Sequence, residues 1–414
     1  MNDLMRSRLV HILRNVVPFT VACMAGCGTG PLHVRLAESV VRPDKSVMMF
    51  LVDGLDVPTM QKLLKQGRLP TIDRLFVKGG VQIRRAIASI PAMTYPNSVS
   101  LMTGCFPGHH GIVGNQWFNG RSLESRDYIT SKTYHLVNRD FTRPTIFEIL
   151  DDQFTVSIQC HTSRGATYAI DNYKLKGFAW GAGLFESIDQ LAAAGIEDVA
   201  WAANRAGRWP SLTLMYFLGV DEIGHRFGSD SGNYESILVN LDRQIKRVED
   251  ALRRAKLFDG MYLVLVSDHG HLPSSSRKTF DLVGALRNIQ SRRIHEGVIE
   301  GEDFAERLTA LDHFDLQIID GSYRRACLFY RCKPGWTNWS VVETHVDSCA
   351  QAVISHDAQH LIKHEAVRMV CTKSDANAVR ITTKRGELLA SRQIEGDKTT
   401  YRLSDSGEAL GYTA

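Results

Sequence analysis

Three runs of apolar residues in this sequence are each followed closely by an aspartate, and this pattern constrains the possible folds more than any other feature. The runs cover residues 46–52, 212–220 and 261–266, and the aspartates are Asp53, Asp221 and Asp268. Continuous apolar runs of this length are typical of strands buried on both faces, as in a parallel sheet. Segments with a helical period lie between them. The alternation predicts an α/β fold, with a central, mostly parallel sheet between helices.

The rest of the chain adds further expected elements to this frame. Helical periodicity is found at 59–76, 234–255, 279–290 and 342–354. Strand-like patterns are found at 79–90, 154–160 and 326–330, and residues 367–392 alternate like a hairpin. We see no internal repeat and no long linker. Residues 31–414 are therefore expected to form one catalytic domain with loop insertions, with a C-terminal end that is incomplete.

The composition is that of a globular protein. Of the 414 residues, 44% are hydrophobic and 23% are charged, which excludes disorder as a description of the whole chain. Lysine and arginine number 49 against 45 acidic residues, which gives a formal net charge of +4. The basic residues are dispersed, whereas nucleic-acid binding requires a clustered basic face. No nucleic-acid-binding surface is expected.

Residues 1–30 have the pattern of an export signal. A basic start precedes an apolar run at 16–26, which is too short for a membrane-spanning helix of about 20 residues. The run ends at Met24-Ala25-Gly26-Cys27, which resembles the box of bacterial lipoproteins, where the cysteine carries the lipid. A signal peptide cleaved without lipid attachment is the alternative. We expect a protein exported to the periplasm or cell surface, with any membrane attachment made through an N-terminal lipid.

The three aspartates are expected at one edge of the sheet, because parallel strands present their carboxyl ends together. His225 lies four residues after Asp221, and His269 directly follows Asp268. Carboxylate and imidazole groups suit zinc, and a bound cation would remove the repulsion between clustered carboxylates. Taken singly, each aspartate is better explained by a helix cap or a loop hydrogen bond. Taken together, the five residues predict a metal site.

Two further polar residues lie in segments rich in proline and glycine. Thr94 stands between Pro91 and Pro96, at the start of a helical stretch whose dipole favours anions. Beside a zinc ion, its hydroxyl can lose a proton and attack phosphorus. A capping role is the alternative. Asn115 ends the segment 103–115, where it is suited to donate its amide to a phosphoryl oxygen or to occupy an ordinary turn.

The order of these motifs resembles the type I phosphodiesterase / nucleotide pyrophosphatase family of the alkaline phosphatase superfamily. The resemblance covers about residues 47–271 and rests on five motifs: Asp53, Thr94-Tyr95-Pro96-Asn97, the segment from Thr103-Gly104 to Gly114-Asn115, Asp221-Glu222-Ile223-Gly224-His225, and Ser267-Asp268-His269-Gly270. It implies an alkaline-phosphatase-like three-layer sandwich. It also implies a two-zinc hydrolase that cleaves phosphodiester or nucleotide pyrophosphate bonds of a small-molecule substrate.

The resemblance further implies roles for individual residues. Asp53, Asp268 and His269 hold one zinc ion, while Asp221 and His225 hold the other. Thr94 is the nucleophile and an additional ligand of the first zinc, and it carries the phosphoryl group of a phospho-threonine intermediate. Asn115 steadies a non-bridging phosphoryl oxygen.

The sequence departs from the family pattern at one expected ligand. The family supplies a further histidine to the second zinc from a downstream His-Gly segment. Here six histidines follow His271, and none is followed by glycine: His295, His313, His345, His356, His360 and His364. No residue is therefore assigned to this role.

Other functions are compatible with the same frame. A phosphomonoesterase of the superfamily would need an extra cation to grip its dianionic substrate, for which Arg164 is a candidate, although a surface role is the better explanation of that residue. A phosphonate hydrolase would have overlapping motifs. A catalytically weakened binding protein is the third alternative. A sulfatase is disfavoured, because Thr94 stands where sulfatases usually carry a modifiable cysteine or serine.

Overall fold

The structure is a computed structural model, and its described residues form two compact units. Unit 1 comprises the chain up to Gly114 and from Tyr128 to Pro273, and unit 2 comprises Asn115–Asp127 and the chain from Ser274 onward. The predicted leader lies outside the described residues, apart from Gly30, and the prediction of a single catalytic domain stays a prediction. The described ranges are 30–83, 86–120, 122–130, 132–272, 280–289, 293–299, 301–322, 325–331, 348–375, 377–396 and 398–404.

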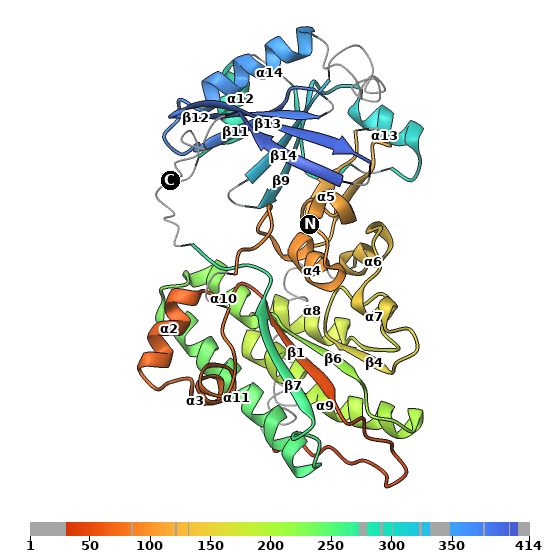
Figure 1. Ribbon diagram of the computed structural model, residues 1–414. Coiled ribbons are helices and arrows are strands. Elements are labelled where there is room, and N and C mark those ends of the chain that lie inside the picture. Colours follow the sequence, from red (N-terminus) through yellow and green to blue (C-terminus); the bar gives the residue numbers. More distant parts are fainter. Residues whose placement is uncertain are drawn as a thin grey trace, which may run out of the picture. The chain divides into compact units, whose positions relative to one another are not determined.

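Unit 1 is built on a five-stranded parallel sheet with the order β5-β4-β6-β1-β7 (Figure 1). In the register of this sheet, Val52 at the end of β1 pairs with Phe217 of β6 and Ser267 of β7. The residues that follow these three strands therefore emerge side by side from the same edge of the sheet. The strands are β1 (Ser46–Val52), β4 (Thr155–Ile158), β5 (Tyr168–Ile170), β6 (Leu212–Phe217) and β7 (Met261–Ser267).

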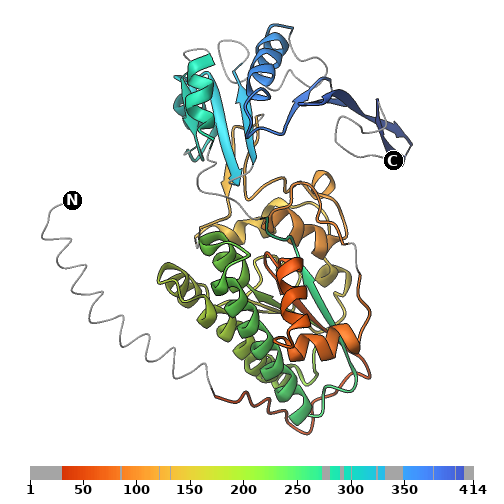
Figure 2. The same cartoon turned by 90° about the vertical axis from the view of Figure 1, so that its left-hand side faces the viewer.

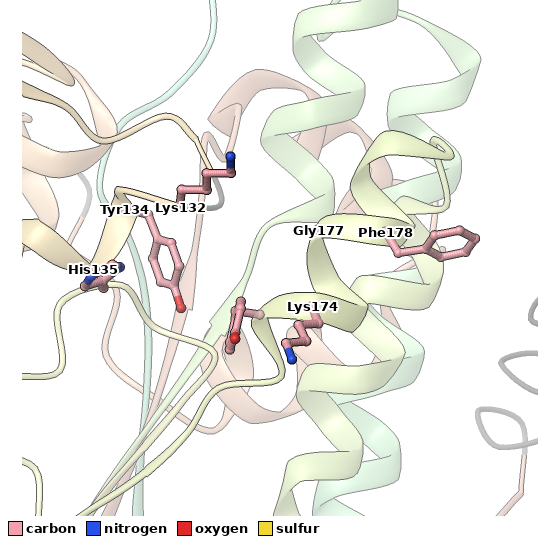
Figure 3. A pocket seen from close by; sticks show the side chains of 7 residues that line it. Lys132, Tyr134, His135, Lys174, Gly177 and Phe178 are labelled. Atoms are coloured by element: carbon pink, nitrogen blue, oxygen red, sulfur yellow. The ribbon is translucent and has the colours of Figure 1, made fainter. Parts of the chain in front are cut away.

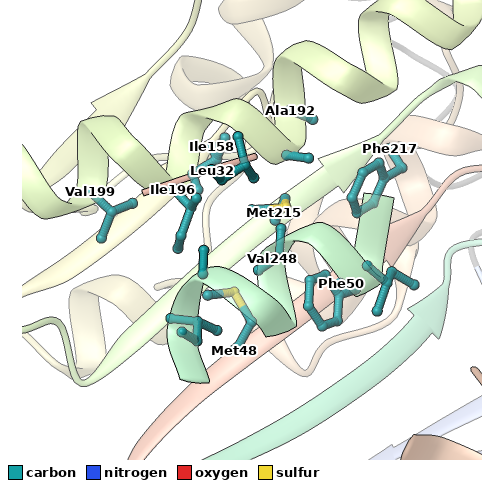
Figure 4. Packing of buried hydrophobic residues seen from close by; sticks show 14 of the residues in the cluster. Leu32, Met48, Phe50, Ile158, Ala192, Ile196, Val199, Met215, Phe217 and Val248 are labelled. Carbon is teal, nitrogen blue, oxygen red and sulfur yellow. The ribbon is translucent and has the colours of Figure 1, made fainter. Parts of the chain in front are cut away.

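Helices cover both faces of this sheet, because alternate strand residues point to opposite sides. On one face, Phe50 and Met215 pack against α9 (Phe185–Ala206) and α11 (Gly232–Arg254) (Figure 4). These two helices run side by side along the sheet (Figure 2). On the other face, Leu51 and Leu214 pack against Met102 of α4 (Thr94–Thr103) and Phe147 of α7 (Ile146–Ile149). The predicted fold class, a mostly parallel sheet between helix layers, is confirmed.

Two local expectations in unit 1 were wrong. The apolar run at 212–220 is not one strand, because β6 ends at Phe217 and a helix begins at Gly219. The strand expected at 79–90 is absent from residues 79–83 and 86–90, whose Val81, Ile83 and Ile87 side chains are exposed. β-branched residues favour a strand only where a neighbouring strand or face can pack against them.

The shorter elements of unit 1 are α2 (Val57–Lys65), α3 (Pro70–Ile72), a π-helical turn (Asp73–Lys78), α5 (Pro107–His110), a 3₁₀ turn (Tyr134–Leu136), α6 (Val137–Asp140), α8 (Tyr173–Gly181) and α10 (Gly219–Phe227).

The described residues of unit 2 contain three smaller sheets. Its strands are β2 (Gln116–Phe118) with β3 (Ser125–Asp127), then β8 (Ile294–Glu296), β9 (Leu316–Ser322) and β10 (Arg325–Tyr330), and finally the antiparallel set β11 (Met369–Lys373), β12 (Ala378–Thr383), β13 (Gly386–Glu395) and β14 (Lys398–Leu403). Its helices are α12 (Leu282–Ile289), α13 (Phe304–Leu311) and α14 (Ser348–Leu361). The expected hairpin at 367–392 is thus part of a four-stranded sheet. Among the described residues of both units, no helix has the length and apolarity needed to cross a bilayer.

The packing of α11 predicts how two substitutions in this helix change the free energy of unfolding. Leu241 is fully buried on the sheet-facing side of this helix, whereas Arg243 is exposed on the same helix. We expect Leu241→Ala to lower the free energy of unfolding by about 2–5 kcal/mol, because it leaves a cavity in a packed core. Arg243→Ala should change it by less than about 0.5 kcal/mol. Urea unfolding followed by circular dichroism measures both, and equal effects would contradict the assigned core face.

Candidate active site

Three buried aspartates meet beyond the carboxyl ends of β1, β6 and β7. Asp53 directly follows β1, and Asp268 directly follows β7. Asp221 instead lies in the first turn of α10, where His225 one turn later shares its helix face. The exposed fractions of the three aspartates are 1% for Asp53, 5% for Asp221 and 2% for Asp268. The structure therefore gathers the predicted carboxylates in a region with little access to water.

The first group of predicted ligands converges on one ring nitrogen. His269 Nε2 lies 3.3 Å from Asp53 Oδ1, 3.8 Å from Asp268 Oδ2 and 3.2 Å from Thr94 Oγ1. These four residues come from three segments far apart in the sequence. They are the same four residues that the resemblance assigns to one zinc.

Thr94 is positioned by the start of α4 and by a buried asparagine. It is the first residue of the helix, and Met93 occupies the N-cap, so Thr94 is not the capping residue that the alternative explanation required. The amide of Asn97 donates to the backbone oxygens of Pro91 at 2.8 Å and Met93 at 3.0 Å. These bonds hold the segment that leads into the helix. The Thr94 hydroxyl is thereby presented to His269.

The second group contains a residue that the sequence analysis did not assign. His225 Nε2 lies 3.3 Å from Asp221 Oδ2, and His271 Nε2 lies 2.9 Å from Asp221 Oδ1. In Asp221, His225 and His271, the candidate ligand atoms all lie within 4.8 Å of one another. A second such group consists of Asp53, Asp221 and His269, so Asp221 belongs to both. The available sequence signal was the spacing His269-Gly270-His271, which places a second imidazole beside a predicted ligand.

The unpaired atoms of these groups fit a bound cation. Among the residues that the structure describes, Asp53 Oδ1, Asp221 Oδ1, Asp268 Oδ2 and His271 Nε2 are buried without a hydrogen-bond partner. The other oxygen of each carboxylate is in contact with the protein. Asp268 Oδ1, for example, accepts from the His269 backbone N–H at 2.8 Å. Buried polar atoms rarely lack partners, and each one costs free energy unless a ligand satisfies it.

The electrostatics of the cluster also favour a cation. Burial, together with repulsion from Asp221 and Asp268, raises the pKa of Asp53 well above its ordinary value. Burial and the Asp221 charge raise the pKa of Asp268 to about 7. Burial opposes ionisation of Asp221 as well, but its contacts with His225 and His271 outweigh this and lower its pKa. Positive charge at this position would allow all three carboxylates to ionise together.

A layer of aromatic residues supports Asp53 and the start of α4. The Tyr216 hydroxyl donates to Asp53 Oδ2. Tyr216 packs edge-on against His161 at 5.1 Å between ring centroids, and His161 packs against Tyr95 at 4.4 Å. Burial lowers the pKa of His161 to about 3, so its ring is neutral at physiological pH. Such outer groups orient ligands and keep water from the site.

Two other predicted residues belong to neither of these groups. Asn115 belongs to unit 2, directly before β2, and its role at the phosphoryl group stays a prediction. Arg164 lies in unit 1 but is engaged in structural contacts. Its guanidinium binds Glu148 at 3.0 Å and the backbone oxygen of Phe141 at 2.7 Å, and it covers the Phe141 ring. Arg164 is therefore occupied with holding loops and is not placed to grip a phosphate.

A separate hollow of unit 1 lies between the 3₁₀ turn and α8 (Figure 3). It contains none of the residues of the two ligand groups, so we do not assign the reaction to it. Its lining combines basic and aromatic side chains: Lys132, Tyr134, His135, Tyr173, Lys174, Gly177 and Phe178.

The segment 103–115 holds a buried histidine that stabilises the end of α4. His110 Nε2 lies 3.0 Å from Ser100 Oγ, and His110 Nδ1 accepts from the Ile112 backbone N–H at 3.2 Å. Burial lowers the pKa of His110 to about 4, with a smaller effect from the neighbouring His109. His110 is therefore a neutral structural residue that links α5 to α4.

Carboxylate, imidazole and hydroxyl groups thus cluster at the carboxyl edge of the parallel sheet, in groups that could hold metal ions. The family model described as "Type I phosphodiesterase / nucleotide pyrophosphatase" matches residues 47–397. The chain belongs to this family, which is the one that the sequence motifs predicted. Hydrolysis of phosphoesters is the chemistry of this family.

Individual relatives are more distant. An uncharacterized pyrophosphatase/phosphodiesterase of Schizosaccharomyces pombe is 26% identical over 56% of this chain and 46% of its own length. The human ectonucleotide pyrophosphatase/phosphodiesterase family member 5 is 24% identical over 50% of this chain and 42% of its own length. The chain thus spans less than half the length of these relatives. Among solved structures, phosphonoacetate hydrolase from Sinorhizobium meliloti 1021 superposes with a TM-score of 0.40 at 18% identity, covering 58% of this chain and 60% of that one.

The environment of His110 predicts how acid acts on this part of the fold. As the pH falls from the ordinary histidine pKa of 6.5 towards 4, the unfolded chain binds a proton that the folded His110 excludes. Stability should therefore decrease over this window. We expect His110→Gln to reduce the difference between urea midpoints measured at pH 7 and pH 5. His109→Gln is the control, since His109 is exposed beside it. If His110→Gln leaves the difference between the urea midpoints at pH 7 and pH 5 unchanged, the assignment of His110 as a buried, neutral residue is wrong.

Proposed function

We propose that this protein hydrolyses phosphodiester or nucleotide pyrophosphate bonds with two zinc ions and a phospho-threonine intermediate on Thr94. The observation that carries the proposal is the 3.2 Å contact between Thr94 Oγ1 and His269 Nε2, beside buried carboxylate oxygens that have no hydrogen-bond partner in the described chain. A hydroxyl held among metal-type ligands, at the start of a ten-residue helix, is well placed to act as a nucleophile.

The residues present suit two metal ions. Asp53, Asp268, His269 and Thr94 would hold one ion, and Asp221 and His225 would hold the other. When bound, zinc ions of this kind lower the pKa of a coordinated hydroxyl and neutralise the charge that develops on attacking and leaving oxygens. Carboxylate and imidazole ligands are the usual choice for zinc.

The protein groups then carry out a double displacement. Thr94 Oγ1 loses its proton to solvent and forms a bond to phosphorus, while the bond from phosphorus to the leaving oxygen breaks and that oxygen takes up a proton. A water molecule next attacks phosphorus, and Thr94 leaves with a proton restored to Oγ1. The backbone N–H groups at the start of α4 favour the anionic phosphoryl group. In this proposal the Asn115 amide steadies a non-bridging oxygen.

The alternatives are less well supported. A phosphomonoesterase needs an additional cation, and Arg164 is bound to Glu148 and to backbone oxygens. A catalytically weakened binding protein has no need for a reactive hydroxyl among ligands, so the position of Thr94 favours an enzyme. A phosphonate hydrolase would use the same groups. Comparing the rates at which the protein cleaves a phosphonate and a phosphodiester distinguishes it from a phosphodiesterase.

We further propose that the protein acts outside the cytoplasm on small-molecule phosphoesters. The basic and apolar pattern of residues 1–30 supports export, and the human relative is named as an ectonucleotide enzyme. Lipid attachment at Cys27 and a periplasmic or cell-surface location are parts of this proposal. Labelling with radioactive palmitate in the source cell, with Cys27→Ala as the control, tests the attachment.

Replacing the nucleophile tests the mechanism. We expect Thr94→Ala to lower the hydrolysis of bis(p-nitrophenyl) phosphate on the order of a thousandfold or more, because no acceptor for the phosphoryl group remains. Zinc content and folding should be largely retained, since the other ligands are unchanged. Thr103→Ala is the matched control at the other end of α4, where the hydroxyl donates to the Val99 backbone oxygen. Normal turnover by Thr94→Ala would exclude the mechanism, and faster cleavage of a phosphonate than of the diester would favour the phosphonate alternative.

Metal removal tests the cofactor assignment. Treatment with a chelator should abolish diester hydrolysis, and added zinc should restore it, because the clustered carboxylates need a cation to act together. Activity that survives complete metal removal, verified by elemental analysis, would contradict the proposed function.

A further inference from the structure

His271 is the one imidazole of the cluster that the family pattern does not explain. It stands two residues after His269, on the segment that follows β7, and 11% of its side chain is exposed. Its ring lies 5.1 Å from the His225 ring and 6.2 Å from the His269 ring, measured between centroids. Its side chain thus lies between residues assigned to the two metal ions.

The contact between His271 and Asp221 has the character of two ligands that share a metal. Their atoms Nε2 and Oδ1 lie 2.9 Å apart. Within the part of the chain that the structure describes, neither atom has a hydrogen-bond partner, so the short contact is not aligned as a hydrogen bond. A bound cation would satisfy both atoms at once, with the imidazole neutral and the carboxylate ionised.

Two glycines make the room that the His271 ring occupies. A Cβ atom at Gly224, on α10 between Asp221 and His225, would lie 2.6 Å from His271 Nε2. A Cβ atom at Gly54, where φ is +60°, would lie 2.6 Å from the same nitrogen and 2.4 Å from Asp221 Oδ1. Tyr234 flanks the ring, and its hydroxyl donates to the Gly54 backbone oxygen at 2.7 Å. The nitrogen therefore lies in a tight space that any side chain at 54 or 224 would fill.

We propose that His271 is the third protein ligand of the second metal ion, together with Asp221 and His225. This assignment rests on the proposed function, and it replaces the downstream histidine that the resemblance implied. Both metal sites would then be complete within residues 53–271 of unit 1. The consecutive residues Asp268 and His269 would serve one ion, and His271 would serve the other.

Counting metal ions in variants of the full chain tests this assignment without relying on activity. Each protein is loaded with zinc, freed of excess metal by desalting, and analysed for zinc per chain. We expect two ions in the wild type and about one in His271→Ala. His271→Cys should keep two, because a thiolate is an effective zinc ligand. His356→Ala, in α14 of unit 2, is the control and should also keep two.

A second variant perturbs the position of His271 without removing any ligand. Gly224→Ala should displace the ring and release the second zinc at lower chelator concentration, while the first zinc is retained. Retention of the first zinc in His271→Ala and Gly224→Ala also shows that the sheet edge is folded.

The possible failures are distinguishable. A wild type that holds two zinc ions and a His271→Ala variant that also holds two would overturn the assignment of His271 and leave the proposed function standing. Loss of one zinc in His356→Ala, with His271→Ala unaffected, would likewise place the ligand downstream. A wild type that holds no zinc under any loading condition would contradict the proposed function itself.

Discussion

The structure of unit 1 depends on the burial of three carboxylates at one edge of a parallel sheet. Asp53, Asp221 and Asp268 are each at most 5% exposed, and each has one oxygen in contact with the protein and one without a hydrogen-bond partner in the described chain. Such an arrangement is costly unless a cation compensates the charge, since buried ions of like sign repel and lose their hydration. The chemistry and the stability of this edge are therefore linked through the same atoms.

The neighbouring elements explain how the chain tolerates this arrangement. The parallel register of β1 with β6 and β7 fixes the level at which Asp53 and Asp268 leave the sheet. Gly54 turns the chain after β1 in a left-handed conformation, and a side chain there would collide with Asp221. Behind the carboxylates, Tyr216 and His161 form a buried aromatic layer that orients Asp53. The positions of the three carboxylates are thus set by the regular strands, by close packing and by hydrogen bonds between the loops that follow β1 and β7.

The position of His271 changes how the site relates to the rest of the chain. In the family pattern, one ligand of the second metal comes from far downstream. In this chain the segment Ser267-Asp268-His269-Gly270-His271 brings imidazoles to both ligand groups within three residues. With this assignment, the proposed protein ligands of both metal ions all belong to unit 1.

The sequence by itself determined the layered α/β fold, the strands at 46–52 and 261–266, and the convergence of Asp53, Asp268 and His269, because apolar runs and strand order are local and general signals. Only the tertiary structure decided that Asp221 lies in a helix and that residues 79–83 and 86–90 form no strand. It also decided two side-chain contacts: Arg164 binds Glu148, and His271 lies beside Asp221 and His225. These outcomes depend on which side chains come into contact when segments distant in the sequence pack together. Linear spacing carries no information about the small volume beside Gly54 and Gly224 into which one imidazole fits.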